Sequence, residues 1–403
     1  MAVLPETVTH LDAGERQQPS LASVERAVKG HMPALDGIRG VAILLVMVCH
    51  FTRIMDPNTP SQLFFSNLTE AGWIGVDLFF VLSGFLITGI LLDSRDSANY
   101  FFSFYMRRIL RIFPLYYTAC FVYLVILPLV QNHLGRLTSV HLIPSDQVWF
   151  WAYAANWGQA VRGRPFNALV HFWSLAIEEQ FYLVWPLVVR VTSKRTFARL
   201  CLALVLVSQL LRLVLYLKGF SLFVIFQITV TRLDGLALGA LTALAVRDEW
   251  WLARVASCLK YLIPLPLVVL VVLGIVSGGF SQTKGPLVIL FSPLLLAVMF
   301  AGILISAIVR RGSKLETYLR VPWLRSCGKY SYAMYVFHLP LMMIVEHQNK
   351  HYFLKAAINA IPGVARILVV VGYVIVSSLL TYVVARLSWW ALESHFINLK
   401  RHF

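Results

Sequence analysis

Charged side chains are scarce in this chain. Asp, Glu, Lys and Arg together make up 13% of the 403 residues, whereas hydrophobic residues make up 59%. Soluble globular domains carry roughly 25% charged residues. This shortage excludes a soluble globular protein of ordinary composition, and a mean hydropathy of +0.73 indicates a polytopic membrane protein.

Acidic residues are the scarcer kind, with 19 Asp and Glu against 35 Lys and Arg, which gives a formal net charge of +16. Such a balance can indicate nucleic-acid binding. Here the basic residues fall in short groups between apolar runs instead of along one helix or tail. Membrane topology explains them better, and we expect no nucleic-acid partner.

Cysteines are few, and they lie singly within or beside apolar segments. They show no close pairing and no metal-ligand spacing, so we expect free thiols and no metal site. The first 30 residues contain no apolar stretch of signal-peptide type, so we expect the first membrane helix to act as the insertion signal. The five cysteines are Cys49, Cys120, Cys201, Cys258 and Cys327.

Apolar runs of about 20 residues, the length of a membrane-spanning helix, recur along the chain. We predict an all-α polytopic membrane protein with about ten transmembrane helices. A further stretch at 148–157 is too short to span and is expected at the membrane interface with its tryptophans. The ten runs are about 34–55, 72–92, 112–131, 171–190, 198–217, 220–246, 259–277, 286–309, 328–346 and 363–387.

The basic residues orient these runs, because cytoplasmic loops are enriched in Lys and Arg. With both termini inside, the predicted inner segments hold most of the basic clusters, and the long outer connection at 132–170 holds few. We therefore expect a polar cytoplasmic tail (1–32), a transmembrane domain (33–388) and a cytoplasmic C-terminal tail (389–403), with no appended soluble domain. The inner basic residues are Arg107, Arg108, Arg111, Lys194, Arg195, Arg199, Arg247, Arg254, Arg310, Arg311, Lys314, Arg320, Arg325, Lys400 and Arg401; the outer ones are Arg136, Arg162, Arg164, Lys218, Lys284, Lys350 and Lys355.

The first run carries an arginine, Arg39, and a histidine, His50. Eleven residues make about three helical turns, so the two side chains share one face roughly 16 Å apart along the axis. An ionisable group inside an apolar span is costly and indicates a functional site. The alternative is an arginine at the headgroups and a histidine bonded to a neighbouring helix.

Other polar residues interrupt later runs. Asp77 and Ser83 lie in the second run, and a carboxylate at that depth needs a partner. In the fourth run, Ser174, Glu178 and Tyr182 form one stripe at i, i+4 and i+8, which we expect to face an interior site. Glu179 is expected to point elsewhere.

Two more groups complete the candidates inside the membrane. Arg232 and Asp234 fall near mid-membrane, where the alternative to a site is a structural charge pair with another helix. Tyr335 and His338 belong to a polar stripe that begins at Gly328. A second histidine at a depth comparable to His50 favours a shared polar cavity.

Arg108 and Arg111 share a face just before the third run. Such a pair can simply enforce topology, but planar guanidinium groups also suit phosphate recognition. Together with Arg39 they would border the cytoplasmic mouth, which favours a polyanionic cytoplasmic ligand.

Six strings, DGIRG followed by His50, GVDLFFVLSGFLI, RRILRIFPLYY, HFWSLAIEEQFYLVWP, TRLDGLALGAL and YSYAMYVFHLP, together resemble the integral-membrane acyltransferase type 3 family. The resemblance runs from about residue 33 to Glu393. It implies transfer of an acyl group, commonly acetyl from acetyl-CoA, to a hydroxyl of a carbohydrate or cell-envelope polymer in a bacterial cell membrane. It also implies that Arg39 and His50 are an essential pair and that Arg108 and Arg111 serve the donor.

The chemistry fits these residues. Acyl-CoA phosphates would rest on the three arginines while the thioester reaches inward to His50, which is the expected general base. Glu178 or Asp77 would orient His50, and His338 would position it. Direct transfer and a histidine-bound acyl intermediate both stay open.

The remaining expectations concern cavity residues and partners. We expect Ser83, Tyr335, Arg232 and Trp173 to line the cavity, and no metal to take part. Many relatives carry an extra esterase-like domain, so a separate extracytoplasmic transferase is an expected partner if the acyl group is relayed. The alternative function is a proton-coupled transporter, although we see no repeat of helix-breaking residues in matching halves. A receptor or structural protein would leave the three arginines and two histidines unexplained.

Overall fold

The computed structural model describes residues 32–133, 144–166, 169–280, 285–310, 312–347 and 350–403. In these ranges the chain is helical and contains no β-strand, which confirms the predicted all-α class. Of the predicted tail (1–32), residues 1–31 lie outside the described residues, as do Arg136, Lys284 and Arg311.

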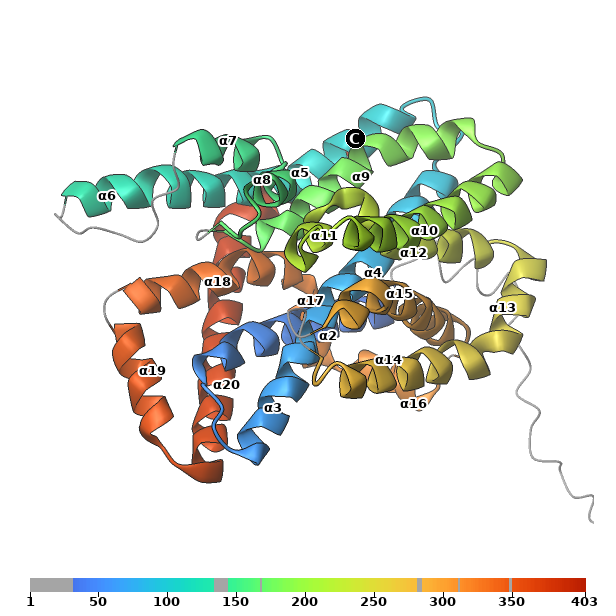
Figure 1. Cartoon of the computed structure of the whole chain (residues 1–403). Coiled ribbons are helices and arrows are strands. Elements are labelled where there is room, and N and C mark those ends of the chain that lie inside the picture. Colours follow the sequence, from blue (N-terminus) through green and yellow to red (C-terminus); the bar gives the residue numbers. More distant parts are fainter. Residues whose placement is uncertain (1–31, 134–143, 167–168, 281–284, 311, 348–349) are drawn as a thin grey trace, which may run out of the picture.

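The helices are numbered as in Figure 1. They are α2 (Pro33–Phe51), α3 (Pro60–Glu70), α4 (Ile74–Asp93), α5 (Tyr100–Phe121), α6 (Leu127–His133), α7 (Pro144–Trp151), α8 (Ala155–Arg162), α9 (Phe172–Val191), α10 (Lys194–Leu217), α11 (Leu222–Gln227), α12 (Leu233–Ala245), α13 (Glu249–Leu262), α14 (Pro264–Val276), α15 (Pro286–Val309), α16 (Lys314–Leu319), α17 (Pro322–Lys329), α18 (Ser331–His347), α19 (Lys350–Ala360), α20 (Gly363–Ser388) and α21 (Ser394–Asn398), with short 3-10 or π turns η1 (Thr52–Ile54), η2 (Ala71–Trp73), η3 (Val122–Ile126), η4 (Thr229–Arg232), η5 (Trp389–Glu393) and η6 (Leu399–His402).

Local sequence explains where many of these helices begin. Proline occupies the first turn of α2, α3, α14, α15 and α17, where its missing N–H costs nothing. Side-chain oxygens of Thr59, Ser193, Ser221, Asp248 and Ser313 accept a first-turn backbone N–H.

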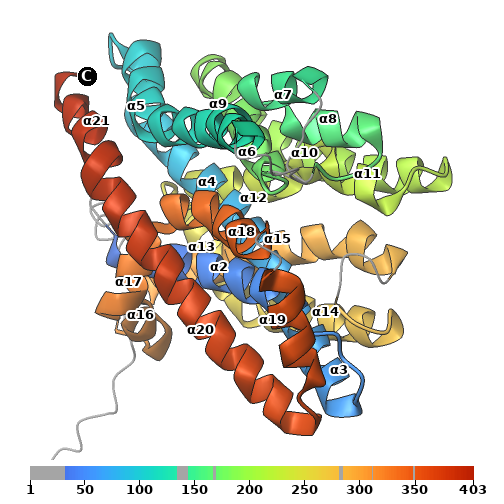
Figure 2. The same cartoon turned by 90° about the vertical axis from the view of Figure 1, so that its left-hand side faces the viewer.

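The centre of the molecule is the crossing of α2, α4 and α12 (Figure 1). Glycines allow it: a Cβ on Gly84 would lie 2.0 Å from the carbonyl oxygen of Leu236, and one on Gly239 would lie 2.0 Å from that of Val81. Only glycine permits backbones to approach this closely, as in many membrane helix pairs. The long helix α20 runs along one side of this core (Figure 2).

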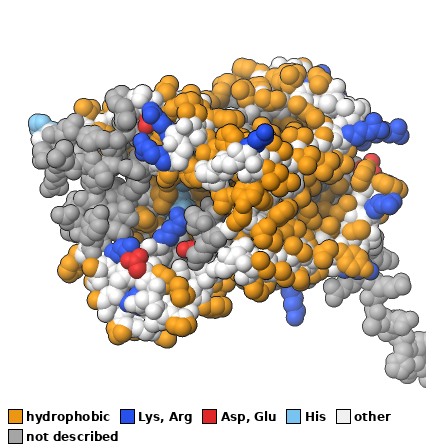
Figure 3. Space-filling model, in the orientation of Figure 1, with side chains coloured by type: hydrophobic (Ala, Val, Ile, Leu, Met, Phe, Trp, Pro, Cys, Tyr) orange, Lys and Arg blue, Asp and Glu red, His pale blue; other side chains and the backbone are white. Residues whose placement is uncertain are grey.

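Among the residues that the structure describes, seven helical segments are long and apolar enough to cross a membrane: Pro33–Ile54, Pro60–Asp93, Tyr100–Val130, Lys194–Leu217, Glu249–Val276, Pro286–Val309 and Gly363–Arg401. Apolar side chains cover much of the surface in Figure 3, as expected for a membrane protein. Each of the ten predicted runs contains helix, but three fall short of this measure. The fourth run, α9, is less apolar because it contains Glu178, Glu179 and Gln180. The ninth run, α18, has only 17 residues. The 220–246 run is interrupted. The count of ten and the orientation stay predictions.

The expectation of one continuous helix over 220–246 is wrong. The chain leaves the helix at Ile228, which is extended, and resumes at Leu233. Side chains satisfy the carbonyl groups that the break releases: Asn156 bonds to Gln227 O at 3.0 Å and Ser208 bonds to Val230 O at 2.7 Å. Unpaired backbone is tolerated at membrane depth only where protein surrounds it in this way.

The stretch at 148–157 forms parts of two eight-residue helices, α7 and α8. Each is about 12 Å long at 1.5 Å per residue, so neither crosses a membrane. The prediction of a non-spanning segment is confirmed.

Candidate active site

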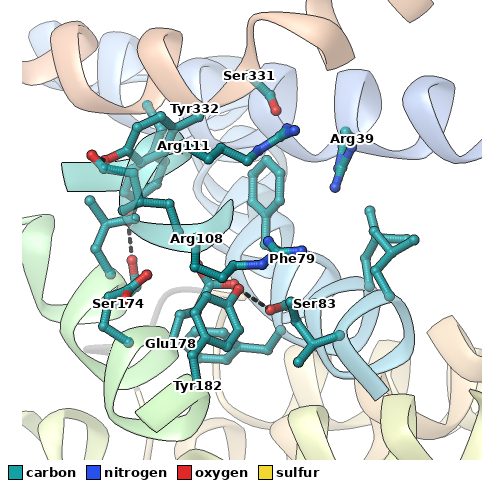
Figure 4. Close-up of a pocket in the computed structure, with 18 of the residues that line it drawn as sticks. Arg39, Phe79, Ser83, Arg108, Arg111, Ser174, Glu178, Tyr182, Ser331 and Tyr332 are labelled. Atoms are coloured by element: carbon teal, nitrogen blue, oxygen red, sulfur yellow. Dashed lines mark hydrogen bonds between the residues drawn. The ribbon is translucent and has the colours of Figure 1, made fainter. Parts of the chain in front are cut away.

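A pocket opens between α2, α4, α5, α9 and α18 (Figure 4), with about 880 Å³ of empty space when the open solvent at its mouth is included. Its lining is apolar on the α4 side and polar on the α5 and α9 sides. The lining residues are Arg39, Val76, Phe79, Phe80, Leu82, Ser83, Leu86, Ile87, Arg108, Arg111, Ile112, Ser174, Leu175, Glu178, Glu179, Tyr182, Ser331, Tyr332 and Tyr335.

The three arginines that the sequence grouped all line this pocket. Arg39 comes from α2, and Arg108 and Arg111 come from one face of α5. Figure 4 shows them reaching into the space around Phe79 from two sides. Within the described ranges Arg108 and Arg111 form no salt bridge, and Arg39 approaches Asp36 only at 3.8 Å. The pocket therefore holds guanidinium groups with free donors.

Helix α9 supplies the pocket's carboxylates. Ser174, Glu178 and Tyr182 lie on the pocket wall as the predicted stripe, and the Ser83 hydroxyl is hydrogen-bonded to Tyr182 (Figure 4). The expectation that Glu179 points elsewhere is wrong, because it also lines the pocket. Neighbouring helical positions differ by only about 100°, so a wide pocket can contact both glutamates.

His50 does not line this pocket; it meets His338 beyond the pocket's end. His338 Nε2 lies 3.2 Å from His50 Nδ1, and the ring centroids are 5.0 Å apart. Two carboxylates were expected to orient His50, but Asp77 pairs with Arg232, and Glu178 lines the pocket that His50 does not reach. Among the described contacts His50 is oriented by His338 and by the backbone oxygen of Val46.

Hydrogen bonds to backbone carbonyls define the tautomers of this pair. His338 Nδ1 lies 2.7 Å from Tyr335 O, and a carbonyl can only accept, so neutral His338 carries its proton on Nδ1. Its Nε2 is then an acceptor. His50 Nδ1–H donates toward both Val46 O at 3.0 Å and His338 Nε2. The second ring nitrogen of His50, Nε2, is left as the basic atom.

A third histidine, His171, completes this cluster and was not among the sequence candidates. Its ring centroid lies 4.9 Å from that of His338, and its Nε2–H donates to Val336 O at 3.2 Å. The helical spacing could have identified this histidine, because His171 lies at the start of α9, three residues before Ser174.

Tyr335 and Ser174 separate the pocket from the histidines. Both line the pocket, and their hydroxyls are 2.6 Å apart. The Tyr335 hydroxyl also donates to His171 O at 3.0 Å, and its ring lies 5.4 Å from that of His338. The end of the pocket is thus one side chain away from the histidine cluster.

A family model for an acyltransferase domain matches residues 32–386. The chain belongs to this acyltransferase family. It is 31% identical over 334 residues to the putative peptidoglycan O-acetyltransferase YrhL of Bacillus subtilis, covering 78% of this chain and 49% of that protein. It is 28% identical over 339 residues to the peptidoglycan O-acetyltransferase OatA of Listeria monocytogenes, covering 79% of this chain and 50% of that one. O-acetyltransferase OatA of Staphylococcus aureus is 27% identical over 336 residues, 78% and 51% of the two chains.

The acyltransferase spans about half the length of these relatives. No solved structure matches it. Family and relatives establish a membrane acyltransferase, as the sequence motifs predicted.

Asp77 and Arg232 lie outside the pocket lining of the acyltransferase. Arg232 Nη2 and Asp77 Oδ1 are 2.7 Å apart, and both side chains are buried. Arg232 is therefore the charge partner of Asp77, and no contact between Asp77 and His50 occurs among the described contacts. Arg232 and Asp77 form the structural charge pair that the sequence left as an alternative.

Trp173 packs against the Asp77–Arg232 pair and does not line the pocket. It packs with Phe226 around the Arg232 guanidinium, whose carbon lies 5.9 Å and 4.5 Å from the two ring centroids. A second buried pair, Arg212 with Asp234 at 2.7 Å, lies on the neighbouring helices α10 and α12. Within the described residues no group of three His, Cys, Asp or Glu side chains is arranged to hold a metal ion.

Proposed function

We propose that this acyltransferase moves an acetyl group from cytoplasmic acetyl-CoA to a hydroxyl of a cell-envelope glycan in a bacterial cell membrane. The observation that carries the proposal is the convergence of Arg39, Arg108 and Arg111 on one pocket that ends beside the histidine cluster. The similarity to peptidoglycan O-acetyltransferases supports the glycan acceptor.

The pocket suits a long donor with a charged end. Acyl-CoA carries phosphates at one end and a thioester at the other, so guanidinium groups at the mouth would bind the phosphates bidentately. The apolar α4 wall, which includes Val76, Phe79 and Leu86, would contact the uncharged arm. The thioester would then lie toward Ser174 and Tyr335.

His50 would act as the general base. Its Nε2 takes the proton of the acceptor hydroxyl while that oxygen attacks the thioester carbonyl. The carbon–sulfur bond breaks, and the proton passes from His50 to the departing thiolate, which leaves as CoA. His338 Nε2 accepts from His50 Nδ1–H throughout and so stabilises the imidazolium. An acyl group held briefly on His50 is the alternative route to the same products.

Donor binding by the purified protein in neutral-lipid nanodiscs tests this proposal. Replacing any one of the three pocket arginines by alanine should weaken acetyl-CoA binding by about 1.5 to 3 kcal/mol, the usual worth of a charge-assisted hydrogen bond. A short acetyl thioester without a nucleotide should lose less. Arg195→Ala, an exposed arginine at the start of α10, is the matched control. Equal losses for both thioesters would mean that the pocket arginines serve folding instead.

Transfer of the acetyl group by the purified protein in the absence of any membrane gradient would support an enzyme and contradict a proton-coupled transporter. Acceptor identity is tested by the acetyl content of envelope glycans in cells with and without the gene. If acetylation also requires a second, extracytoplasmic transferase, the purified protein alone will turn over acetyl-CoA but leave the glycan unmodified.

A further inference from the structure

The C-terminal segment of the chain lies against the start of α5. Helix α21 and the turn η6 both pack on α5, and Figures 1 and 2 show the C-terminus beside it. Arg107 Nε donates to Phe403 O at 2.9 Å, and the rings of Phe102 and Phe403 meet edge to face at 5.6 Å. These contacts fix the segment next to the pocket arginines.

This placement brings a lysine into a group of arginines. Lys400 lies on η6, which packs on α5, and it is partly buried three residues before Phe403, whose carbonyl oxygen accepts from Arg107. Arg107, Arg108 and Arg111 all belong to this part of α5, and their charges act on Lys400. Two of these three line the pocket. Within the described ranges no carboxylate forms a salt bridge with Lys400. The nearest carboxylate along the segment, Glu393, is bonded by Ser388 Oγ at 3.0 Å.

Four like charges in one region repel one another, and the carboxylates of Glu178, Glu179 and Glu393 nearby offset only part of this repulsion. A bound anion would offset the remainder. A lysine ammonium is a compact point charge suited to a phosphate. Neighbouring cations at the rim of a pocket also raise the local concentration of an anionic ligand.

We infer that Lys400 binds the outermost phosphate of the donor nucleotide, so that the C-terminal segment forms part of the donor site. This inference rests on the proposed function. CoA carries a diphosphate and, on the ribose, a separate 3′-phosphate. Arg39, Arg108 and Arg111 inside the pocket would hold the diphosphate, and Lys400 together with Arg107 at the rim would hold the 3′-phosphate. Phosphate groups of anionic lipids share this chemistry, and the experiment separates the two sources.

The test compares acetyl-CoA with acetyl-3′-dephospho-CoA on the full chain in nanodiscs of neutral lipid. The wild-type protein should bind acetyl-CoA about tenfold or more tightly than the dephospho compound, the worth of one charge-assisted contact. Lys400→Ala should lower this ratio to near one by weakening acetyl-CoA alone. Lys400→Arg should preserve most of the ratio. Arg401→Ala, which removes the same charge from the adjacent exposed residue, should leave the ratio unchanged.

Each other outcome overturns the inference in a recognisable way. An unchanged ratio in Lys400→Ala, with acetyl-CoA binding still lost in Arg108→Ala, would refute the role of Lys400 and leave the donor pocket standing. Failure of the wild-type protein to bind either compound would refute the proposed function itself. If Lys400→Ala loses only a stimulation seen in phosphatidylglycerol nanodiscs, Lys400 binds lipid headgroups and the inference is wrong.

Discussion

The buried pair of Asp77 and Arg232 gives the sharpest prediction about which charges serve the fold. The two side chains are 4% and 1% exposed, they are 2.7 Å apart, and Phe80, Trp173 and Phe226 surround the guanidinium. Asp77→Ala would leave a buried cation without its counter-charge. Removing one partner of such a pair typically costs about 3 to 5 kcal/mol.

Arg232→Met combined with Asp77→Leu should recover most of this loss, because replacing both partners by apolar groups of similar size is often neutral or stabilising. The assay is thermal unfolding in detergent, paired with acetyl-CoA binding by the folded fraction. We expect Asp77→Ala to lower the melting temperature, the double variant to restore it, and donor affinity to stay unchanged in both. A double variant that is stable but no longer binds acetyl-CoA or transfers the acetyl group would refute the structural role of the pair. It would mean that Asp77 and Arg232 take part in the active site.

Further predictions concern the base and the topology. His50→Ala should cut acyl transfer by about 10² to 10⁴-fold, the usual contribution of a general base, while acetyl-CoA binding persists; near wild-type transfer would end the proposal. His338→Ala should cut transfer less, and its activity should depend differently on pH, because His50 Nδ1–H would lose one of its two acceptors and keep only Val46 O. In a background without the five native cysteines, Arg164→Cys should react with an impermeant label from outside the cell and Asp96→Cys should not. The reverse pattern would overturn the predicted orientation.

Helical spacing predicted the pocket residues well where one face of one helix was involved. The stripe of Ser174, Glu178 and Tyr182 and the pair Arg108 and Arg111 all reach the pocket. Periodicity gives the face of a helix, but it does not give the width of the pocket that the face meets. For that reason Glu179, one position along, was misjudged.

Contacts between helices were beyond the sequence. Whether His50 lies beside Glu178 or beside His338 depends on how α2, α9 and α18 cross, and no spacing within one helix encodes that angle. The break at Ile228 was missed for a related reason. The residues from Gln227 to Thr231 include no glycine or proline, and the break is stabilised by Asn156 and Ser208 from distant segments.

Pairing separates the two kinds of intramembrane charge in this protein. The sequence offered both Arg232, near mid-membrane, and Arg108, at the cytoplasmic mouth, as candidates for a site. Arg232 has a carboxylate at 2.7 Å on the neighbouring helix α4, so its charge is neutralised before any ligand arrives. Arg108 has no salt bridge within the described ranges and contacts the rings of Phe104 and Tyr182 at 5.9 Å and 5.7 Å. Glu178 and Glu179 line the same pocket, but neither forms a salt bridge with Arg108 within the described ranges, so its guanidinium group keeps donors for a phosphate-bearing ligand.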